Sequence, residues 1–158
     1  MLLMHFGEVF MKQTLASGVI PQITAIFGTC GGGAALIPNL TDVTFMTKEG
    51  AKLFVNSPNA LDENRAEKLD TAAADYVAEN TANVDAVYDT EAELLGAVRT
   101  MVGLLPSNNE DDGDCAVCED DVNRIIPDLA TKAGDVKAVI ADITDDEFVF
   151  ELKKDFCR

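Results

Sequence analysis

A run of small residues between two apolar segments constrains the fold of this chain more than any other feature. The segment Gly28-Thr29-Cys30-Gly31-Gly32-Gly33-Ala34-Ala35 separates the apolar run 19–27 from the apolar run 43–46. Such a pattern is typical of a strand, a tight turn and a helix start. Glycine has no Cβ, so the backbone of this turn can approach a ligand closely. The unpaired N–H groups of a helix start can stabilise an oxyanion or a phosphate. The alternative is a turn that only lets a helix pack closely on a sheet.

The periodicity of the rest of the chain predicts an α/β fold. Residues 2–17 have the spacing of a helix that stops at Gly18. We expect strands at 19–27, 42–47, 51–56 and 84–88, further helices at 33–39, 62–80, 91–104 and 136–143, and an extended piece at 148–152. Because strand, helix and strand follow one another over 19–47, the strands are expected to be parallel. The sequence has no repeat and no evident linker, so we expect one domain.

The segment 91–104 carries the clearest helix signals. Thr90 is a suitable N-cap, and Glu93 stands at the position that completes a capping box. Pro106 ends the helix. The apolar residues at helical spacing predict its core face, which consists of Leu94, Leu95, Val98, Met101 and Val102.

Charge excludes two classes of partner. The chain has 28 acidic and 12 basic residues and a formal charge of −16, which argues against binding to nucleic acid or to an anionic membrane surface. The uncharged stretch 15–40 is long enough to span a bilayer, but Pro21, Gln22, Asn39 and its glycines favour a buried strand and helix instead. The opening residues 1–4 lack the basic residues of a secretory signal, so we expect a cytoplasmic protein without membrane insertion.

The cysteines give little indication of a metal site. Only Cys115 and Cys118 have suggestive spacing, and a tetrahedral zinc site needs further ligands, whereas His5 is the only histidine. The acidic residues around this pair disfavour the thiolate that redox chemistry needs. We therefore expect an exposed acidic loop over 107–121 and no metal, with a metal or redox role for the pair as the alternative.

Three strings in the first third of the chain form one pattern. They are Thr14-Leu15-Ala16-Ser17-Gly18-Val19-Ile20-Pro21-Gln22-Ile23, then Gly28-x-Cys30-x-Gly32-Gly33-Ala34, then Pro38-x-Leu40-Thr41-Asp42-x-x-Phe45-Met46. This pattern resembles the carboxyltransferase subunits of biotin-dependent acyl-CoA carboxylases and decarboxylases, such as propionyl-CoA carboxylase beta chains. Weaker similarities follow in the family's order at 105–109, 123–127 and 140–151.

The resemblance implies a crotonase-like (ClpP/crotonase) α/β fold with mainly parallel strands and packed helices. It also implies that residues 1–158 are a partial amino-terminal domain, truncated at both ends. In the family, carboxybiotin delivers carbon dioxide to an acyl-CoA, biotin accepts the proton, and backbone amides hold the thioester enolate in an oxyanion hole. Carried over by position, Gly32 and Gly33 are the catalytic candidates. Gly28, Gly31 and Ala34 complete the turn that binds coenzyme A.

The resemblance also implies partners. The substrate would be a short acyl-CoA such as propionyl-, acetyl-, methylmalonyl- or glutaconyl-CoA, and the cofactor would be biotin on a partner carrier protein. Other carboxylase or decarboxylase subunits and further copies of the chain would complete the assembly. The phosphates of coenzyme A need basic contacts, for which Lys12, Lys48, Lys52 or residues outside this chain are the candidates.

One segment departs from the family pattern. Where the family carries paired glycines and a histidine on the acyl-CoA side of its site, this chain reads Asn64-Arg65-Ala66-Glu67-Lys68-Leu69-Asp70-Thr71. We therefore keep a second interpretation, in which the chain is a non-catalytic crotonase-like scaffold or interaction domain. Under either interpretation we expect no carboxyltransferase turnover from the isolated chain.

Overall fold

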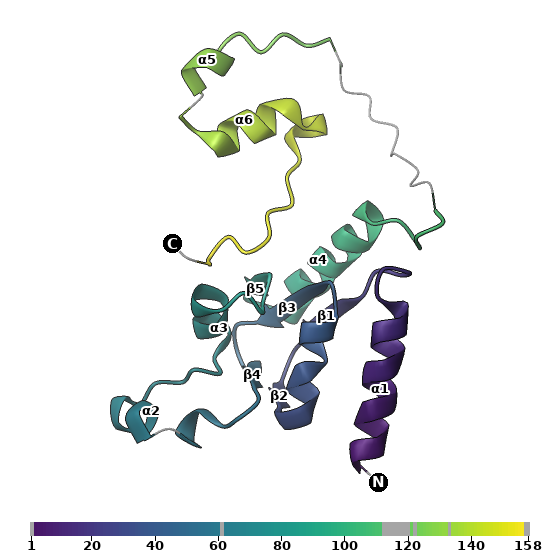
Figure 1. The fold of residues 1–158 in the computed structure, drawn as a ribbon. Helices are drawn as coiled ribbons and strands as arrows, with labels where there is room; N and C mark the ends of the chain where they lie inside the picture. The colour runs from purple at the N-terminus through teal and green to yellow at the C-terminus, as the bar shows by residue number, and fades with distance from the viewer. Residues whose placement is uncertain (1, 61, 112–120, 122, 133, 157–158) are drawn as a thin grey trace. The chain divides into compact units, whose positions relative to one another are not determined.

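The computed structural model describes residues 2–60, 62–111, 121, 123–132 and 134–156 (Figure 1). The chain divides into two compact units, of which the first comprises 1–113 with 152–158 and the second comprises 114–151. The expectation of one domain over 1–158 stays a prediction. Cys115 and Cys118, the only cysteines with suggestive spacing, lie outside the described residues.

The first unit is built on parallel strands in two sheets. The larger sheet has the order β1 (Ile23–Ile26), β3 (Val43–Thr47), β5 (Ala86–Tyr88), and both of its pairings are parallel. In the smaller sheet β2 (Thr29–Gly31) pairs in parallel with β4 (Lys52–Phe54). The parallel arrangement predicted from the sequence is therefore confirmed.

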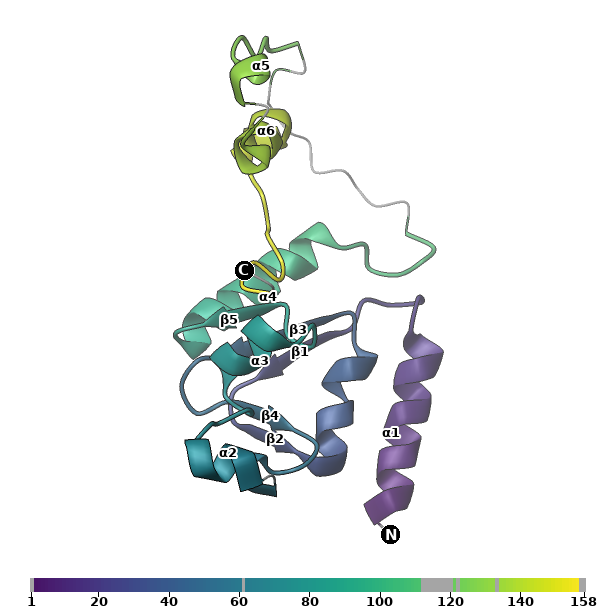
Figure 2. The same ribbon diagram turned by 60° about the vertical axis from the view of Figure 1, so that its left-hand side comes forward.

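The chain passes from the larger sheet to the smaller one twice, at neighbouring points. It does so between β1 and β2 and again between β3 and β4 (Figure 2). The two crossings are joined, because the Lys52 backbone N–H donates to the Gly28 carbonyl at 3.1 Å. The prediction of a tight turn over the glycine segment is therefore incomplete, because residues 29–31 of this segment form strand β2.

Strand β1 is shorter than the predicted strand 19–27 because the first residues of that run belong to the end of a helix. The N–H groups of Val19 and Ile20 both donate to the Ala16 carbonyl, at 2.9 and 3.1 Å. That carbonyl lies in the last turn of α1 (Leu2–Ala16), the helix predicted over 2–17. Gly18 follows with φ +73, the left-handed conformation typical of a helix end.

Two predicted helices are broken in the structure. The predicted helix 33–39 consists of two 3₁₀ helices, η1 (Gly32–Leu36) and η2 (Pro38–Leu40), because Pro38 has no N–H to continue a ladder. The predicted helix 62–80 consists of α2 (Asp62–Glu67) and α3 (Ala74–Asn80). Lys68 has φ +54, which ends α2. A further 3₁₀ helix, η3 (Pro58–Ala60), precedes α2.

Helix α4 (Glu91–Leu104) has the predicted bounds and packs on the three-stranded sheet. The capping box is confirmed, since the Thr90 side chain accepts the Glu93 N–H at 3.2 Å and the Glu93 carboxylate accepts the Thr90 N–H at 3.1 Å. The predicted core face is wrong in part. Leu94 and Met101 are buried, whereas Leu95 is 55% exposed and Val102 is 60% exposed.

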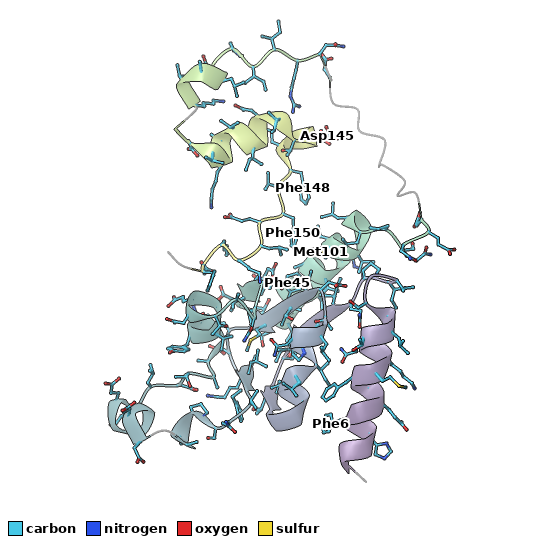
Figure 3. All side chains as sticks on the ribbon, viewed as in Figure 1. Phe6, Phe45, Met101, Asp145, Phe148 and Phe150 are labelled. Carbon is cyan, nitrogen blue, oxygen red and sulfur yellow. The ribbon has the colours of Figure 1, made fainter. Side chains whose placement is uncertain are left out.

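The core of the first unit lies between these elements. Its largest fully buried side chains are Phe45, Met46, Val84 and Leu94. The Phe45 ring meets Tyr88 edge to face at 5.7 Å between centroids, and Figure 3 shows Phe45 and Met101 in this region. Within the part of the chain that the structure describes, no helix is long and apolar enough to cross a membrane.

The second unit contains α5 (Leu129–Lys132), α6 (Val136–Ile143) and the 3₁₀ helix η4 (Asp145–Glu147). Helix α6 has the predicted bounds, and the Asp135 side chain caps it by accepting the Ala138 N–H at 3.2 Å. At its other end the Arg124 guanidinium donates to the carbonyls of Asp142 and Thr144, at 2.8 and 2.7 Å. This cation satisfies carbonyls that the helix leaves unpaired.

Candidate functional site

Two adjacent glycines of the turn are required for different physical reasons. Gly32 has φ +62, a conformation that residues with a Cβ rarely adopt. Gly31 has an ordinary extended conformation, but a Cβ there would lie 2.8 Å from the Phe54 ring. Gly28 and Gly33 differ from both, since a Cβ on Gly28 would meet nothing within 4 Å and one on Gly33 would lie 3.5 Å from the Phe6 ring.

The turn leads into the first residues of η1. Gly32 and Gly33 open this 3₁₀ helix, at the end where the first N–H groups have no carbonyl partner in the helix. Gly31 is its N-cap, and no side chain of the described residues caps the helix start. The predicted donors therefore lie at an uncapped helix start, and Gly33 is exposed. Their contact with a substrate stays a prediction.

Cys30, within the turn, is a packing residue. Its side chain lies against the buried core cluster that includes Ile26, Met46 and Leu53. Burial raises the pKa of its thiol, so the neutral form dominates at neutral pH. This agrees with its interpretation as a small buried residue rather than a nucleophile.

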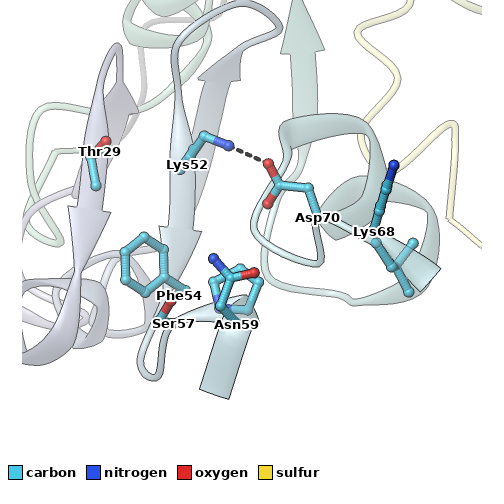
Figure 4. Close-up of a pocket in the computed structure, with 9 residues that line it drawn as sticks. Thr29, Lys52, Phe54, Ser57, Asn59, Lys68 and Asp70 are labelled. Atoms are coloured by element: carbon cyan, nitrogen blue, oxygen red, sulfur yellow. Dashed lines mark hydrogen bonds and ion pairs between the residues drawn. The ribbon is translucent and has the colours of Figure 1, made fainter. Parts of the chain in front are cut away.

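A cavity of about 470 Å³ adjoins the turn on the side of the smaller sheet (Figure 4). Thr29 contributes from β2, Lys52 and Phe54 contribute from β4, and the other walls come from the chain around η3 and between α2 and α3. The described residues that line it are Thr29, Lys52, Phe54, Ser57, Pro58, Asn59, Lys68, Leu69 and Asp70. Because the Phe54 ring faces both the cavity and Gly31, the cavity and the turn share a wall.

Among the described residues, three charged side chains line this cavity. The Lys52 ammonium donates to Asp70 Oδ2, and Asp70 Oδ1 accepts the Ala72 backbone N–H at 3.2 Å. The hydrogen bond from Lys52 lowers the pKa of the Asp70 carboxyl group, although partial burial opposes this effect. Lys68 adds a second positive charge, so the described charged side chains of the lining sum to +1 in a chain of net charge −16.

Sequence reasoning found only part of this site. The sequence indicates Lys52 as a candidate for a phosphate contact, but it marks Lys68 and Asp70 only as members of the segment that departs from the family pattern. That departure was the available signal. Lys48, another candidate, forms an exposed ion pair with Asp75 at 3.3 Å and does not line the cavity. The described residues contain no group of three or more potential metal ligands.

Comparison with known proteins identifies the family. Residues 2–158 match the family model of the carboxyl transferase domain. The chain belongs to this family. Curated relatives include the carboxyltransferase subunit of propionyl-CoA carboxylase from Haloferax mediterranei, which is 32% identical over 97% of this chain and 32% of the relative. Another is the alpha subunit of methylmalonyl-CoA decarboxylase from Veillonella parvula, which is 35% identical over 94% of this chain and 31% of the relative.

Solved structures confirm the crotonase-like α/β fold of this carboxyl transferase family member. The structure of transcarboxylase 12S with hydrolysed methylmalonyl-coenzyme A superposes with a TM-score of 0.85 at 26% identity. It matches 98% of this chain, which corresponds to 32% of that protein. The chain therefore spans about a third of the length of the proteins it matches.

Proposed function

We propose that this chain forms the acyl-CoA-binding part of a biotin-dependent acyl-CoA carboxyltransferase. The observation that carries the proposal is the family match over residues 2–158, which includes the whole glycine turn. The named relatives act on propionyl-CoA or methylmalonyl-CoA, and a second transcarboxylase 12S structure contains bound methylmalonyl-coenzyme A. A short-chain acyl-CoA is accordingly the proposed substrate.

In this proposal the backbone performs the chemistry that this chain contributes. The N–H groups of Gly32 and Gly33 donate to the thioester oxygen, which becomes negative when the neighbouring carbon loses a proton or a carboxyl group. Donors fixed before the reaction stabilise that charge more than water does, and the loss of one typically costs about a hundred- to thousandfold in turnover. The left-handed conformation of Gly32 and the uncapped start of η1 support this assignment.

The rest of the turn positions these donors. Gly28 lies where the chain crosses between the sheets, and Gly31 lets the Phe54 ring pack against the backbone. Ala34 follows the two donors in η1. Biotin on a partner carrier protein would supply or accept the carboxyl group. We assign no residue of this chain to biotin.

A second candidate function is a crotonase-like scaffold that has lost catalysis. The observation in its favour is the segment 64–71, in which Lys68 and Asp70 form part of a cavity wall where the family has paired glycines and a histidine. The two functions differ in one respect that can be measured, which is whether the chain binds an acyl-CoA at the glycine turn.

Calorimetric titration of propionyl-CoA into the purified chain tests the proposal. The variant Gly33→Val places side-chain atoms beside the proposed donor and should weaken binding about two- to tenfold, as expected for the loss of a hydrogen bond between neutral groups. The control is Gly103→Val in α4, where a Cβ meets nothing within 4 Å. Circular dichroism checks that both variants are folded. Absence of binding by the folded wild-type chain, or equal effects of the two variants, would contradict the proposal and favour the scaffold.

A further inference from the structure

The cavity beside the glycine turn has a positive charge balance that is unusual for this chain. Acidic residues outnumber basic ones by 28 to 12 in the sequence, whereas two of the three charged side chains known to line the cavity, within the described part of the chain, are lysines. Its volume of about 470 Å³ lies within the range of small-ligand sites, roughly 300 to 1,000 Å³. Phe54 supplies an apolar wall, and Thr29 and Ser57 supply hydroxyl groups.

The only charge partner of Lys52 in the described part of the chain is readily exchanged for another anion. The side chains of Lys52 and Asp70 are each 43% exposed, and ion pairs of this exposure contribute little to stability because water and salt screen them. Asp70 also accepts the Ala72 N–H, so its carboxylate keeps a partner when the Lys52 ammonium moves away. An incoming oxyanion therefore competes with a weak internal contact.

We infer that Lys52 is an anion-binding residue of this cavity, and that Asp70 is the internal anion which the ligand displaces. The ligand group is an oxyanion, either a phosphate of the coenzyme A moiety or a free carboxylate on the acyl group. This inference deepens the proposed function and rests on it, because the cavity shares the Phe54 wall with the turn that would hold the thioester.

The position of Lys52 distinguishes it from Lys48. Lys52 lies on β4, opposite Thr29 in the register of the smaller sheet, and both residues line the cavity. Figure 4 shows the Lys52 ammonium directed to Asp70 across the upper part of this space. Lys48 lies in the loop after β3, where its side chain is 52% exposed and pairs with Asp75 outside the cavity. The two lysines therefore form a matched pair, with similar exposure and one carboxylate partner each.

Affinity measurements on three variants test the inference. Lys52→Met removes the charge and should weaken binding of methylmalonyl-CoA, which carries both candidate oxyanions, about 10- to 100-fold, the effect of losing a charge-assisted contact. Asp70→Asn removes the competing anion and should tighten binding by about two- to fivefold, the scale of an exposed ion pair. Lys48→Met is the control and should change affinity by less than about twofold. Thermal unfolding verifies that each variant is folded.

Two further probes identify the oxyanion. Adenosine 3′,5′-bisphosphate carries phosphates without a thioester, and methylmalonyl-CoA carries a free carboxylate that propionyl-CoA lacks. If Lys52→Met weakens binding of propionyl-CoA and of the bisphosphate, the inference is supported and the group is a phosphate. If it weakens binding of methylmalonyl-CoA alone, the inference is supported and the group is the carboxylate.

The remaining outcomes separate this inference from the proposed function. Binding of both acyl-CoAs that depends on Gly33 but is unchanged in Lys52→Met, or is weakened equally in Lys48→Met, overturns the inference and leaves the proposed function intact. Lys52-dependent binding of the bisphosphate, without binding of either acyl-CoA, supports an anion site and overturns the proposed function. If a folded chain binds none of the three probes, both are overturned.

Discussion

Single residues show where sequence reasoning was sufficient and where it was not. The glycine cluster was recognisable because glycine is the usual residue for a tight turn, but the sequence could not separate the roles of its members. Gly32 is required by its own backbone conformation, whereas Gly31 is required by the Phe54 ring, which is distant in sequence. Lys68 and Asp70 were missed as site residues because they are distant from Lys52 in sequence and line the same cavity only in the folded chain.

This difference among the glycines gives a prediction about stability. Gly32→Ala forces an L-residue to keep φ +62 and should lower the free energy of unfolding by about 1–2 kcal/mol. Gly28→Ala is the comparison, because Gly28 has no positive φ and a Cβ there meets nothing within 4 Å. It should leave stability unchanged or raise it by up to about 1 kcal/mol. Urea unfolding measures both, and equal losses in the two variants would show that the backbone conformation is not the cause.

At the scale of elements, the accuracy of prediction depended on whether the determining signals were local. The bounds of α4 were predicted because the Thr90 and Glu93 cap is encoded within four consecutive residues. The strand β2 was missed because three residues containing glycine do not look like a strand until β4 pairs with them. The helix predicted over 62–80 is interrupted at Lys68. This residue has a left-handed conformation, which the sequence does not indicate because the position is not a glycine.

Helix α4 also shows that an apolar face can be wider than the surface it buries. Leu94 is fully buried and Leu95 is 55% exposed, although the sequence pattern placed both in the core. Leu94→Ala should cost about 2–5 kcal/mol of unfolding free energy, because it leaves a cavity under the sheet. Leu95→Ala removes the same atoms from the same helix and should cost less than about 0.5 kcal/mol. Chemical denaturation of the two variants measures both free energies of unfolding. A similar loss of stability in Leu94→Ala and Leu95→Ala would contradict the burial described for α4.

At the scale of the whole molecule, the parallel direction of the strands was predictable, whereas the division between two sheets was not. A helix that connects two apolar strands indicates that these strands run parallel in the sheet. The crossings from β1 to β2 and from β3 to β4 are joined by a hydrogen bond between Gly28 and Lys52, a long-range contact that no local sequence pattern indicates. The resemblance to the carboxyl transferase family supplied the fold that periodicity alone left open.

The outer face of α4 supports a prediction about association. Leu95 and Val102 are seven residues apart, so they lie on one face of the helix, and they are 55% and 60% exposed. Val102 also lines an apolar hollow of about 310 Å³ with Ile20 and Leu105. Apolar surface of this kind, rimmed by polar residues, is typical of interaction sites. We therefore expect the chain to self-associate through this face.

Sedimentation velocity over a range of protein concentrations tests the expected self-association. The wild-type chain should sediment faster as its concentration rises, and the double variant Leu95→Lys with Val102→Lys should shift this transition to at least about tenfold higher concentration, because a charge buried in an apolar contact is costly. Leu15→Lys is the control, since Leu15 is 70% exposed but lies on α1. If this control shifts the transition equally, the association has no preference for the α4 face. A wild-type chain that remains monomeric throughout would refute the prediction itself.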